Sequence, residues 1–474
     1  MSMTKKLPST QEKALQINLD AQKYGTFAEI GAGQEVARWF FHVGKASSTV
    51  AKSISAYDVA ISDDLYGATD HYVSRPRLEA MLDREFGQLS ERLKGTRGEK
   101  DAFFVFADTV ATHSSSPSQT GHGWLGVRFQ DQAGAEPSEV IIHIEMLDVS
   151  TGSQQEAVGI LGVNLVYGAC YHSHDPNFFV GMLMDGLDRR RIEVDMIKFS
   201  GPAFRDVDNR LIILHAVEQG LTDAVMFTAD GEVVQPSEVL QDRPVLIERG
   251  SFRPVTNVTL EMLEAALPQL RQDTKLAGDP IILMEMTLSN LMSGPEIDHQ
   301  DFLARADILA TLGKTVMISN YTTFDRVTSY LRHYTQKMVA MVVGVPTLQA
   351  IFEEKYYSDL EGGILEGLGR LFSGPTKVLV YPTVDTEGAH LKTADKLSVA
   401  PELAHLYAHL FENRFIESVL NFEKAQWHVS PGDVRKKIQS GDPTWQSLVP
   451  AEAAALIVQK GLFGYRRPSG SPPD

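Results

Sequence analysis

The chain has 474 residues, with 43% hydrophobic and 22% charged side chains, and a formal net charge of −17 from 44 basic and 61 acidic groups. This negative charge argues against broad binding to nucleic acids or to anionic membranes, because both require lysine and arginine to neutralise phosphate. The single Cys170 cannot form an internal disulfide, the amino terminus has no apolar signal core, and no run approaches the ~18 apolar residues of a membrane-spanning helix. The sequence therefore predicts a soluble, cytoplasmic protein.

Residues 14–190 predict an amino-terminal α/β domain behind a flexible tail at 1–13. A helix is expected over Arg75–Leu93, because its apolar residues recur with helical spacing. A serine-rich loop is expected around 114–118. Strands are predicted at Phe103–Ala107, Trp124–Phe129, Val140–Met146 and Val163–Tyr167.

Residues 191–400 alternate short apolar runs with amphipathic segments, which is typical of a parallel sheet wrapped by helices. The runs are Ile192–Phe199, Asp223–Phe227, Pro244–Ile247, Pro280–Met286, Lys314–Ile318, Met338–Val345 and Lys377–Tyr381. A helical segment at 401–463 and a flexible tail at 464–474 follow. The predicted fold class is α/β, a mostly parallel doubly wound sheet with an amino-terminal α/β unit and a carboxy-terminal helical segment.

Two glycines, Gly31 and Gly33, lie between a short apolar stretch and a helical pattern that begins near Val36. Glycines in such a turn let the backbone approach a phosphate or ribose, and the helix amino terminus favours an anion. We therefore consider Gly31 and Gly33 candidate cofactor-binding residues. The alternative is a turn that packs a helix closely and binds nothing.

Cys170, His172 and His174 follow the strand expected at Val163–Tyr167. In an extended segment alternate side chains point the same way, so these three are candidate ligands for zinc or iron. The alternative is a polar loop at a strand end.

Polar side chains follow the apolar runs of the second domain, where a parallel sheet would gather them on one rim. Basic groups and hydroxyls suit phosphate or carboxylate recognition, and an acid suits a base or a metal ligand. The alternative is that strand ends are simply polar. The candidates are Lys198 and Asp230 as catalytic residues and Arg249, Arg253, Ser319 and Asn320 as binding residues.

Several stretches resemble a bacterial family of similar length, among them YGTFAEIGAGQEVARWFF, RIEVDMIKFSGPAF and EEKYYSDLEGGILEGLGRLF. The resemblance covers nearly the whole chain and implies no assigned function. Members of that family are labelled TonB-dependent receptor or nicotinate-nucleotide adenylyltransferase. The first label implies an outer-membrane barrel, which the helical repeats here argue against. The second implies a His-x-Gly-His type nucleotide loop, and the near form Gly121-His122-Gly123 differs from it in spacing.

Together these observations predict a protein that binds or transforms a small anionic metabolite, either a nucleotide or a phosphate ester. The sequence identifies no cofactor. The alternative is a non-catalytic, homo-oligomeric scaffold, because apolar side chains recur after Ala400 in a stripe wide enough to cover a partner as well as a core. That stripe includes Leu403, Leu406, Tyr407, Leu410, Phe411 and Phe415.

Overall fold

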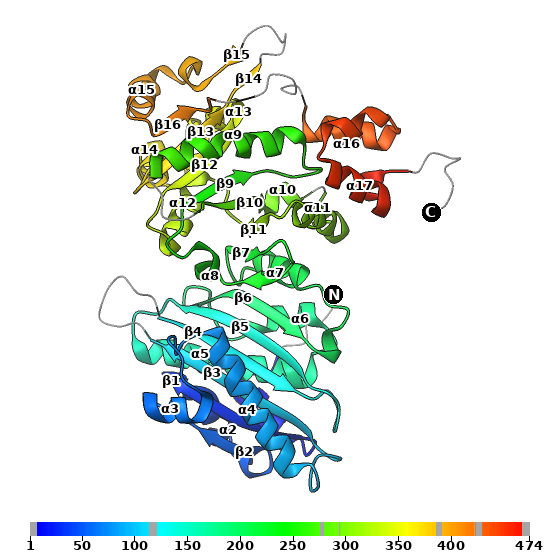
Figure 1. Cartoon of the computed structure of the whole chain (residues 1–474). Helices are drawn as coiled ribbons and strands as arrows, with labels where there is room; N and C mark the ends of the chain where they lie inside the picture. Colours follow the sequence, from blue (N-terminus) through cyan, green and yellow to red (C-terminus); the bar gives the residue numbers. More distant parts are fainter. Residues whose placement is uncertain are drawn as a thin grey trace, which may run out of the picture. The chain divides into compact units, whose positions relative to one another are not determined.

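The structure, a computed structural model, describes residues 7–112, 121–274, 279–292, 294–384, 391–420, 422 and 429–466. The serine-rich segment at 114–118 lies outside these ranges. The chain divides into two compact units, Met1–Asp223 and Ala224–Asp474, each built around its own sheet (Figure 1). None of the helices in the described ranges combines the length and apolar character that crossing a bilayer requires.

The first unit contains a six-stranded sheet in the order β2-β1-β3-β4-β5-β6. β1 is parallel to β2 and β3, whereas β3 to β6 are antiparallel neighbours. The strands are β1 (Lys23–Gly31), β2 (Val50–Ile54), β3 (Ala102–Ala111), β4 (Gly121–Phe129), β5 (Ser138–Met146) and β6 (Ile192–Ser200).

Helices cover both faces of this first sheet. One face packs in a single core with five helices, α1 (Thr10–Leu19), α2 (Glu35–His42), α5 (Thr151–Tyr171), α6 (Pro176–Leu183) and α7 (Asn209–Glu218). The other face packs against α4 (Arg75–Leu93), which α3 (Val59–Tyr66) contacts in turn. Ser74 caps α4 by accepting from the Arg77 amide, as the predicted helix requires.

The strand predicted at Val163–Tyr167 is wrong, because these residues lie within α5. The helix is buried on nearly all sides from Ala157 to Ala169, so its sequence shows a continuous apolar run and no helical periodicity. Such a run cannot be told from a buried strand by periodicity alone.

The second unit contains an eight-stranded sheet in the order β16-β13-β12-β9-β10-β11-β7-β8. All neighbours from β16 to β11 are parallel, and β7 and β8 form an antiparallel edge. The strands are β7 (Ala224–Phe227), β8 (Val233–Val234), β9 (Val245–Arg249), β10 (Ile281–Thr287), β11 (Thr315–Ser319), β12 (Val339–Gly344), β13 (Thr376–Tyr381) and β16 (Ile416–Ser418). β14 (Thr383–Val384) and β15 (Leu391–Lys392) form a separate hairpin ladder.

Helices wrap both faces of this second sheet, so the predicted doubly wound α/β fold is confirmed. Side chains of α12 (Phe324–Tyr334), α13 (Val345–Ile351) and α14 (Gly363–Leu371) share one core with alternate residues of the central strands. α9 (Asn257–Thr274) contacts β9 and β12 (Figure 1). The remaining helices are α8 (Pro236–Leu240), α10 (Leu288–Leu291), α11 (His299–Thr311), α15 (Ala404–Glu412), α16 (Pro431–Ser440) and α17 (Ala451–Lys460).

Two sequence predictions concern the ends of this unit, namely the domain boundary at 190 and the apolar stripe after Ala400. β6, which begins just after the expected domain boundary at 190, is the edge strand of the first sheet. In the apolar stripe after Ala400, three side chains are buried in the core of their own unit, namely Leu403, Tyr407 and Leu410.

Candidate functional site

The carboxyl ends of β9, β10 and β11 meet at a buried ion pair between Arg249 and Glu285. Arg249 donates from Nε and Nη2 to the two oxygens of Glu285, at 2.8 and 2.9 Å. The Ser319 hydroxyl donates to the same carboxylate at 2.6 Å. Because Glu285 is fully buried, these three hydrogen bonds replace the water that its charge has lost.

Arg249 also reaches the wall of a neighbouring cavity. Its Nη1 donates to the Thr322 carbonyl at 3.2 Å, and its guanidinium carbon lies 4.3 Å from the centre of the Phe324 ring. The cavity has a volume of about 180 Å³, and we call it the threonine cavity. Its lining residues are Thr322, Thr323, Phe324, Thr347, Ala350, Ile351, Tyr356 and Tyr357.

The threonine cavity lies at the start of α12. Thr323 is the N-cap residue of this helix, but its side chain accepts no hydrogen bond from the first turn. The backbone N–H groups of that turn can therefore donate to another acceptor. The helix dipole adds positive potential at the same place. The lining contains three threonines, two tyrosines and no carboxylate.

Two larger cavities carry carboxylates. One, of about 520 Å³ in the first unit, has Glu35 and Glu156 in its wall. The other, of about 690 Å³ in the second unit, has Glu353, Glu354 and Glu402. Their walls also contain Arg38 and Lys355 respectively, so each holds more carboxylates than lysines or arginines. Of these three cavities, the threonine cavity is the one whose lining has no carboxylate to repel an anion.

Glu248 occupies the position before Arg249, so its side chain points to the opposite face of the sheet. It is only 6% exposed, and its Oε2 has no hydrogen-bond partner. Burial raises the pKa of this carboxyl well above its usual range, and the charge of Lys314 offsets only part of the rise.

The candidates expected on one rim do not all gather there. β7 runs antiparallel to β11, so Asp230, which follows β7, lies at the opposite edge from Ser319. Lys198 belongs to β6, in the sheet of the first unit. An apolar run shows neither the direction of its strand, which misplaced Asp230, nor the sheet to which it belongs, which misplaced Lys198.

The other rim candidates remain at the expected edge but differ in their partners. Arg253 donates to Asp301 at 2.6 Å, and Arg305 shares that carboxylate. Asn320 is exposed directly after β11. The basic side chains are thus neutralised by carboxylates, and the neutral donors are the groups available to a ligand.

Gly31 and Gly33 belong to a turn that lies close to β3, beside two buried acids of the first sheet. Glu29 and Asp108 are direct neighbours on the parallel strands β1 and β3, and both are almost fully buried. A Cβ on Gly33 would stand 2.1 Å from an Asp108 oxygen, and Gly31 has a φ of 78°. The close approach of this turn to β3 thus requires both glycines without any ligand.

The two acids of this pair are held differently. Glu29 accepts hydrogen bonds from the amides of Val36 and Ala37 at 2.9 and 3.2 Å, whereas neither oxygen of Asp108 has a hydrogen-bond partner. Burial raises the pKa of Glu29 to about 7, against the opposing effect of the two amides. Burial and the charge of Glu29 raise the pKa of Asp108 well above its usual range.

The proposed metal ligands at the end of α5 do not share the extended geometry expected of them. Cys170 lies in the last turn of α5, and His172 ends that helix. The rings of His172 and His174 are 6.3 Å apart, and within the described residues these two and Cys170 do not form a group able to share one metal ion. Burial raises the pKa of the Cys170 thiol to about 12, which keeps it protonated.

The sequence analysis missed the buried acids. Their signal is present, since Glu248 and Glu285 each interrupt an apolar run that forms a central strand. An acid within such a run must be paired, protonated or bound to a ligand. The predicted run Pro244–Ile247 stopped before Glu248, and the run Pro280–Met286 contained Glu285 without its charge being considered.

No protein-family model and no curated protein matches this sequence. Among solved structures, the competence/damage-inducible protein CihA from Agrobacterium tumefaciens is 17% identical, covers 35% of this chain and 94% of its own, and gives a TM-score of 0.24. A CinA superfamily protein from Enterobacter cloacae is 12% identical, with 34% and 90% covered and a TM-score of 0.24. A putative nicotinate-nucleotide adenylyltransferase from Vibrio parahaemolyticus is 13% identical, with 47% and 97% covered and a TM-score of 0.21. TM-scores this low support no inference about function.

Proposed function

We propose that the second unit binds a small anionic metabolite, a nucleotide or another phosphate ester, in the threonine cavity. The observation that carries this proposal is the position of the cavity at the carboxyl edge of a doubly wound sheet. Thr322 and Thr323 follow β11, and Thr347 follows β12.

The strand order supports the same location. From β9 the chain moves outward through β10 and β11, then returns to place β12 on the other side of β9. The order β11-β10-β9-β12-β13-β16 is that of Rossmann sheets, in which ligands bind outside the carboxyl ends where the order reverses. The threonine cavity lies on this edge.

Neutral donors would hold the anion. Hydroxyls of Thr322, Thr323 and Thr347 and the first amides of α12 supply hydrogen bonds, and the exposed ring of Tyr356 supplies a surface for a base or sugar. Arg249 acts indirectly, because its contacts with Thr322 and Phe324 fix two residues of the wall.

Calorimetric titration with inorganic phosphate, AMP and ADP tests this proposal. We expect at least one of the three to bind, and we expect the double variant Thr322→Val/Thr347→Val to weaken that binding about tenfold or more. A hydrogen bond to a charged group contributes about 1.5–3 kcal/mol, and valine keeps the shape of threonine while removing the hydroxyl.

Thr96→Val is the matched control, since Thr96 is exposed in the first unit and should leave the affinity unchanged. Failure of all three probes to bind at millimolar concentration would contradict the proposal. Equal binding by the wild type and the double variant would also contradict it.

A further inference from the structure

The cavity of about 520 Å³ in the first unit lies among three helices, α1, α2 and α5. Its volume falls within the ~300–1,000 Å³ that sites for small molecules occupy. We call it the tryptophan cavity. Its lining includes Gln11, Glu35, Trp39, Gly152, Gln155 and Glu156.

Two glycines of α5 allow α2 to approach closely on one side of this cavity. A Cβ on Gly162 would stand 2.3 Å from a methyl carbon of Val36, and a Cβ on Gly159 would stand 3.1 Å from Trp39 Nε1. From these contacts α2 follows α5 towards the amino terminus of α5. There, at Gly152, an added Cβ would meet nothing within 4 Å. The space beside Gly152 is therefore open, and it belongs to the cavity.

Three hydrogen bonds fix α1 against α5 on another side. Each joins residues that lie 151 positions apart, so the two helices run side by side in the same direction. The pairs are Lys13 with Asn164 at 2.8 Å, Gln16 with Tyr167 at 3.0 Å, and Asp20 with Tyr171 at 3.1 Å. Because α1 and α2 are both held against α5, the walls of the cavity are formed without a ligand, as is usual for small-molecule sites.

The charged groups of the lining already have partners. Glu35 pairs with Arg38 at 2.7 Å, and Glu156 pairs with Arg191 at 2.9 Å. By contrast, the side chains of Gln11, Trp39 and Gln155 make no hydrogen bond within the described ranges. The groups available to a ligand are thus two carboxamides and an indole, all of them neutral.

We propose that the tryptophan cavity binds an uncharged, planar nitrogen heterocycle, such as the base of a nucleoside. A carboxamide presents a donor and an acceptor side by side, and so pairs with the edge of a base that carries an acceptor next to a donor. An indole ring provides a flat surface on which a base can stack. Gln11, Gln155 and Trp39 supply these groups from three different helices.

The carboxylates of the lining should exclude a phosphorylated form of the same ligand. Glu35 and Glu156 stand against a single basic residue of the lining, Arg38. A phosphate group would add negative charge to a wall that already has an excess of it, so a nucleoside should bind better than its monophosphate. The threonine cavity is expected to have the opposite preference. This inference is therefore independent of the function proposed for the second unit.

Calorimetric titration of the full chain with adenosine, cytidine and uridine tests the proposal. We expect at least one nucleoside to bind at one site per chain, and we expect Trp39→Leu to weaken that binding about tenfold or more, since it removes the stacking surface. The binding should persist in Thr322→Val/Thr347→Val. Binding that persists in Trp39→Leu and disappears in this double variant would overturn the proposal. So would the absence of nucleoside binding at millimolar concentration.

A variant that fills the cavity avoids any dependence on the folding of Trp39→Leu. Gly152→Phe places a ring in the open space, and we expect it to weaken nucleoside binding about tenfold or more. Gly87→Phe is the matched control, because Gly87 lies in α4, an added Cβ there also meets nothing within 4 Å, and it does not line the cavity. Phenylalanine is a better helix former than glycine, so both variants should fold. Equal binding by Gly152→Phe and Gly87→Phe would overturn the proposal.

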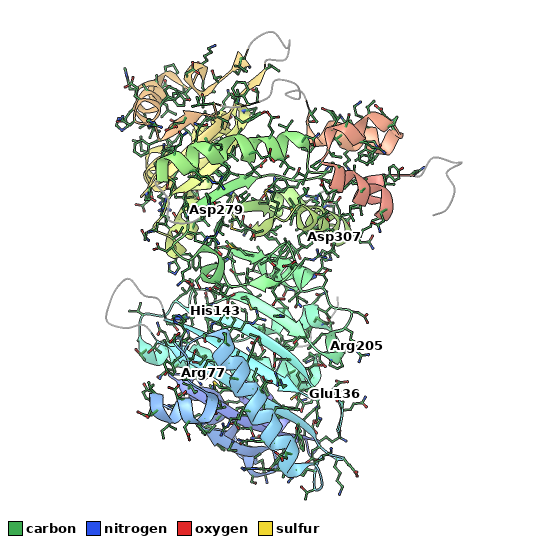
Figure 2. All side chains as sticks on the ribbon, viewed as in Figure 1. Arg77, Glu136, His143, Arg205, Asp279 and Asp307 are labelled. Carbon is green, nitrogen blue, oxygen red and sulfur yellow. The ribbon has the colours of Figure 1, made fainter. Side chains whose placement is uncertain are left out.

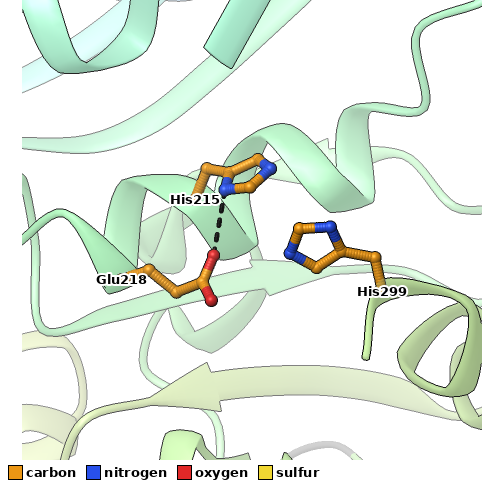
Figure 3. Close-up of side chains that lie close together, drawn as sticks. All are labelled: His215, Glu218 and His299. Atoms are coloured by element: carbon orange, nitrogen blue, oxygen red, sulfur yellow. Dashed lines mark ion pairs between the residues drawn. The ribbon is translucent and has the colours of Figure 1, made fainter. Parts of the chain in front are cut away.

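The preference for an unphosphorylated ligand is tested through Glu35. In the background of Thr322→Val/Thr347→Val, Glu35→Gln should raise the affinity for the monophosphate relative to the nucleoside, because it removes one negative charge from the wall. Glu218→Gln is the matched control: Glu218 is 25% exposed, as Glu35 is, and it pairs with His215, three positions away on α7, at 2.9 Å (Figure 3).

Glu136→Gln is a second control, because Glu136 is an exposed carboxylate of the first unit outside the lining (Figure 2). Both control variants should leave the ratio of the two affinities as it is in the parent protein. An unchanged ratio in Glu35→Gln, or the same change in all three variants, would overturn the proposal.

Discussion

The two sheets accommodate a buried acid in opposite ways. In the second unit Glu285 is buried and accepts three hydrogen bonds, two from Arg249 and one from Ser319. In the first unit Asp108 lies beside another acid, Glu29, and its oxygens have no hydrogen-bond partner. Glu285 is paired with a basic side chain, whereas Asp108 lies beside a second acid, and its pKa is raised by burial and by the charge of Glu29.

This difference affects how each unit responds to pH. Glu29 has a pKa of about 7 in the folded chain, above its ordinary value of 4.5. Between these two values the unfolded chain loses a proton that the folded chain keeps. The contribution of the acid pair to stability is therefore present below pH about 4.5 and declines as the pH rises through about 7.

The largest expected effect follows from removing the counter-ion. Arg249→Met leaves Glu285 charged and buried without its main partner, and we expect the variant to lose about 3–5 kcal/mol of unfolding free energy. Urea denaturation followed by circular dichroism measures this loss. The double variant Arg249→Met/Glu285→Met should recover most of it, because it leaves no unpaired charge. A loss below ~1 kcal/mol in the single variant would contradict the role given to Arg249.

A smaller effect, with the opposite sign, follows from neutralising Asp108. Asp108→Asn keeps the shape under Gly33 and abolishes the repulsion with Glu29. We expect the melting temperature of the variant relative to that of wild type to rise as the pH increases from 5 to 8. One unit of pKa corresponds to ~1.4 kcal/mol, which sets the expected scale. A difference that does not change with pH would show that the charge of Glu29 does not raise the pKa of Asp108.

The smallest effect is expected at Glu248, which lies in the same sheet as Glu285 but has a raised pKa like Asp108. Glu248→Gln replaces the carboxyl by a neutral amide of similar shape. Because burial raises the pKa of Glu248, we expect the unfolding free energy at pH 6 to change by less than about 1 kcal/mol. Denaturation curves of the two proteins at that pH provide the measurement. A loss of ~3 kcal/mol or more would mean that Glu248 is ionised and paired.

The fold could be predicted where an element is identified by the pattern of apolar residues within its own sequence. Central strands such as β10 and β12 are short apolar runs between helical patterns, and α4 shows its apolar stripe directly in the sequence. α5 could not be assigned in this way, because a helix buried on nearly all sides loses the periodicity that identifies it. The direction of β7 could not be predicted either, since an antiparallel edge strand and a parallel one have similar composition.

The candidate site was predicted only in part, because its chemistry depends on distant contacts. Arg249 and Ser319 were expected at the same edge, and the structure brings both to Glu285. That partner lies 36 and 34 positions away in the chain, and nothing in the local sequence indicates the pairing. The same holds for Asp108 and Glu29, which become neighbours only through the register of β1 with β3.

β6 contains a β-bulge, because its pairing with β5 shifts register between His143 and Ile144. The hydrophobic core does not need the extra residue of this bulge. Ile192 and Val194 face the core before it, and Ile197 and Phe199 face the core after it, so the spacing of inward residues changes from two to three and back to two. Removing one residue between Val194 and Ile197 would give a regular strand with the same inward side chains. Packing therefore gives no reason to keep the additional residue. The additional residue is Asp195, whose carboxylate lies 2.6 Å from His143 Nδ1, and a chain one residue shorter here would test whether this contact depends on the bulge.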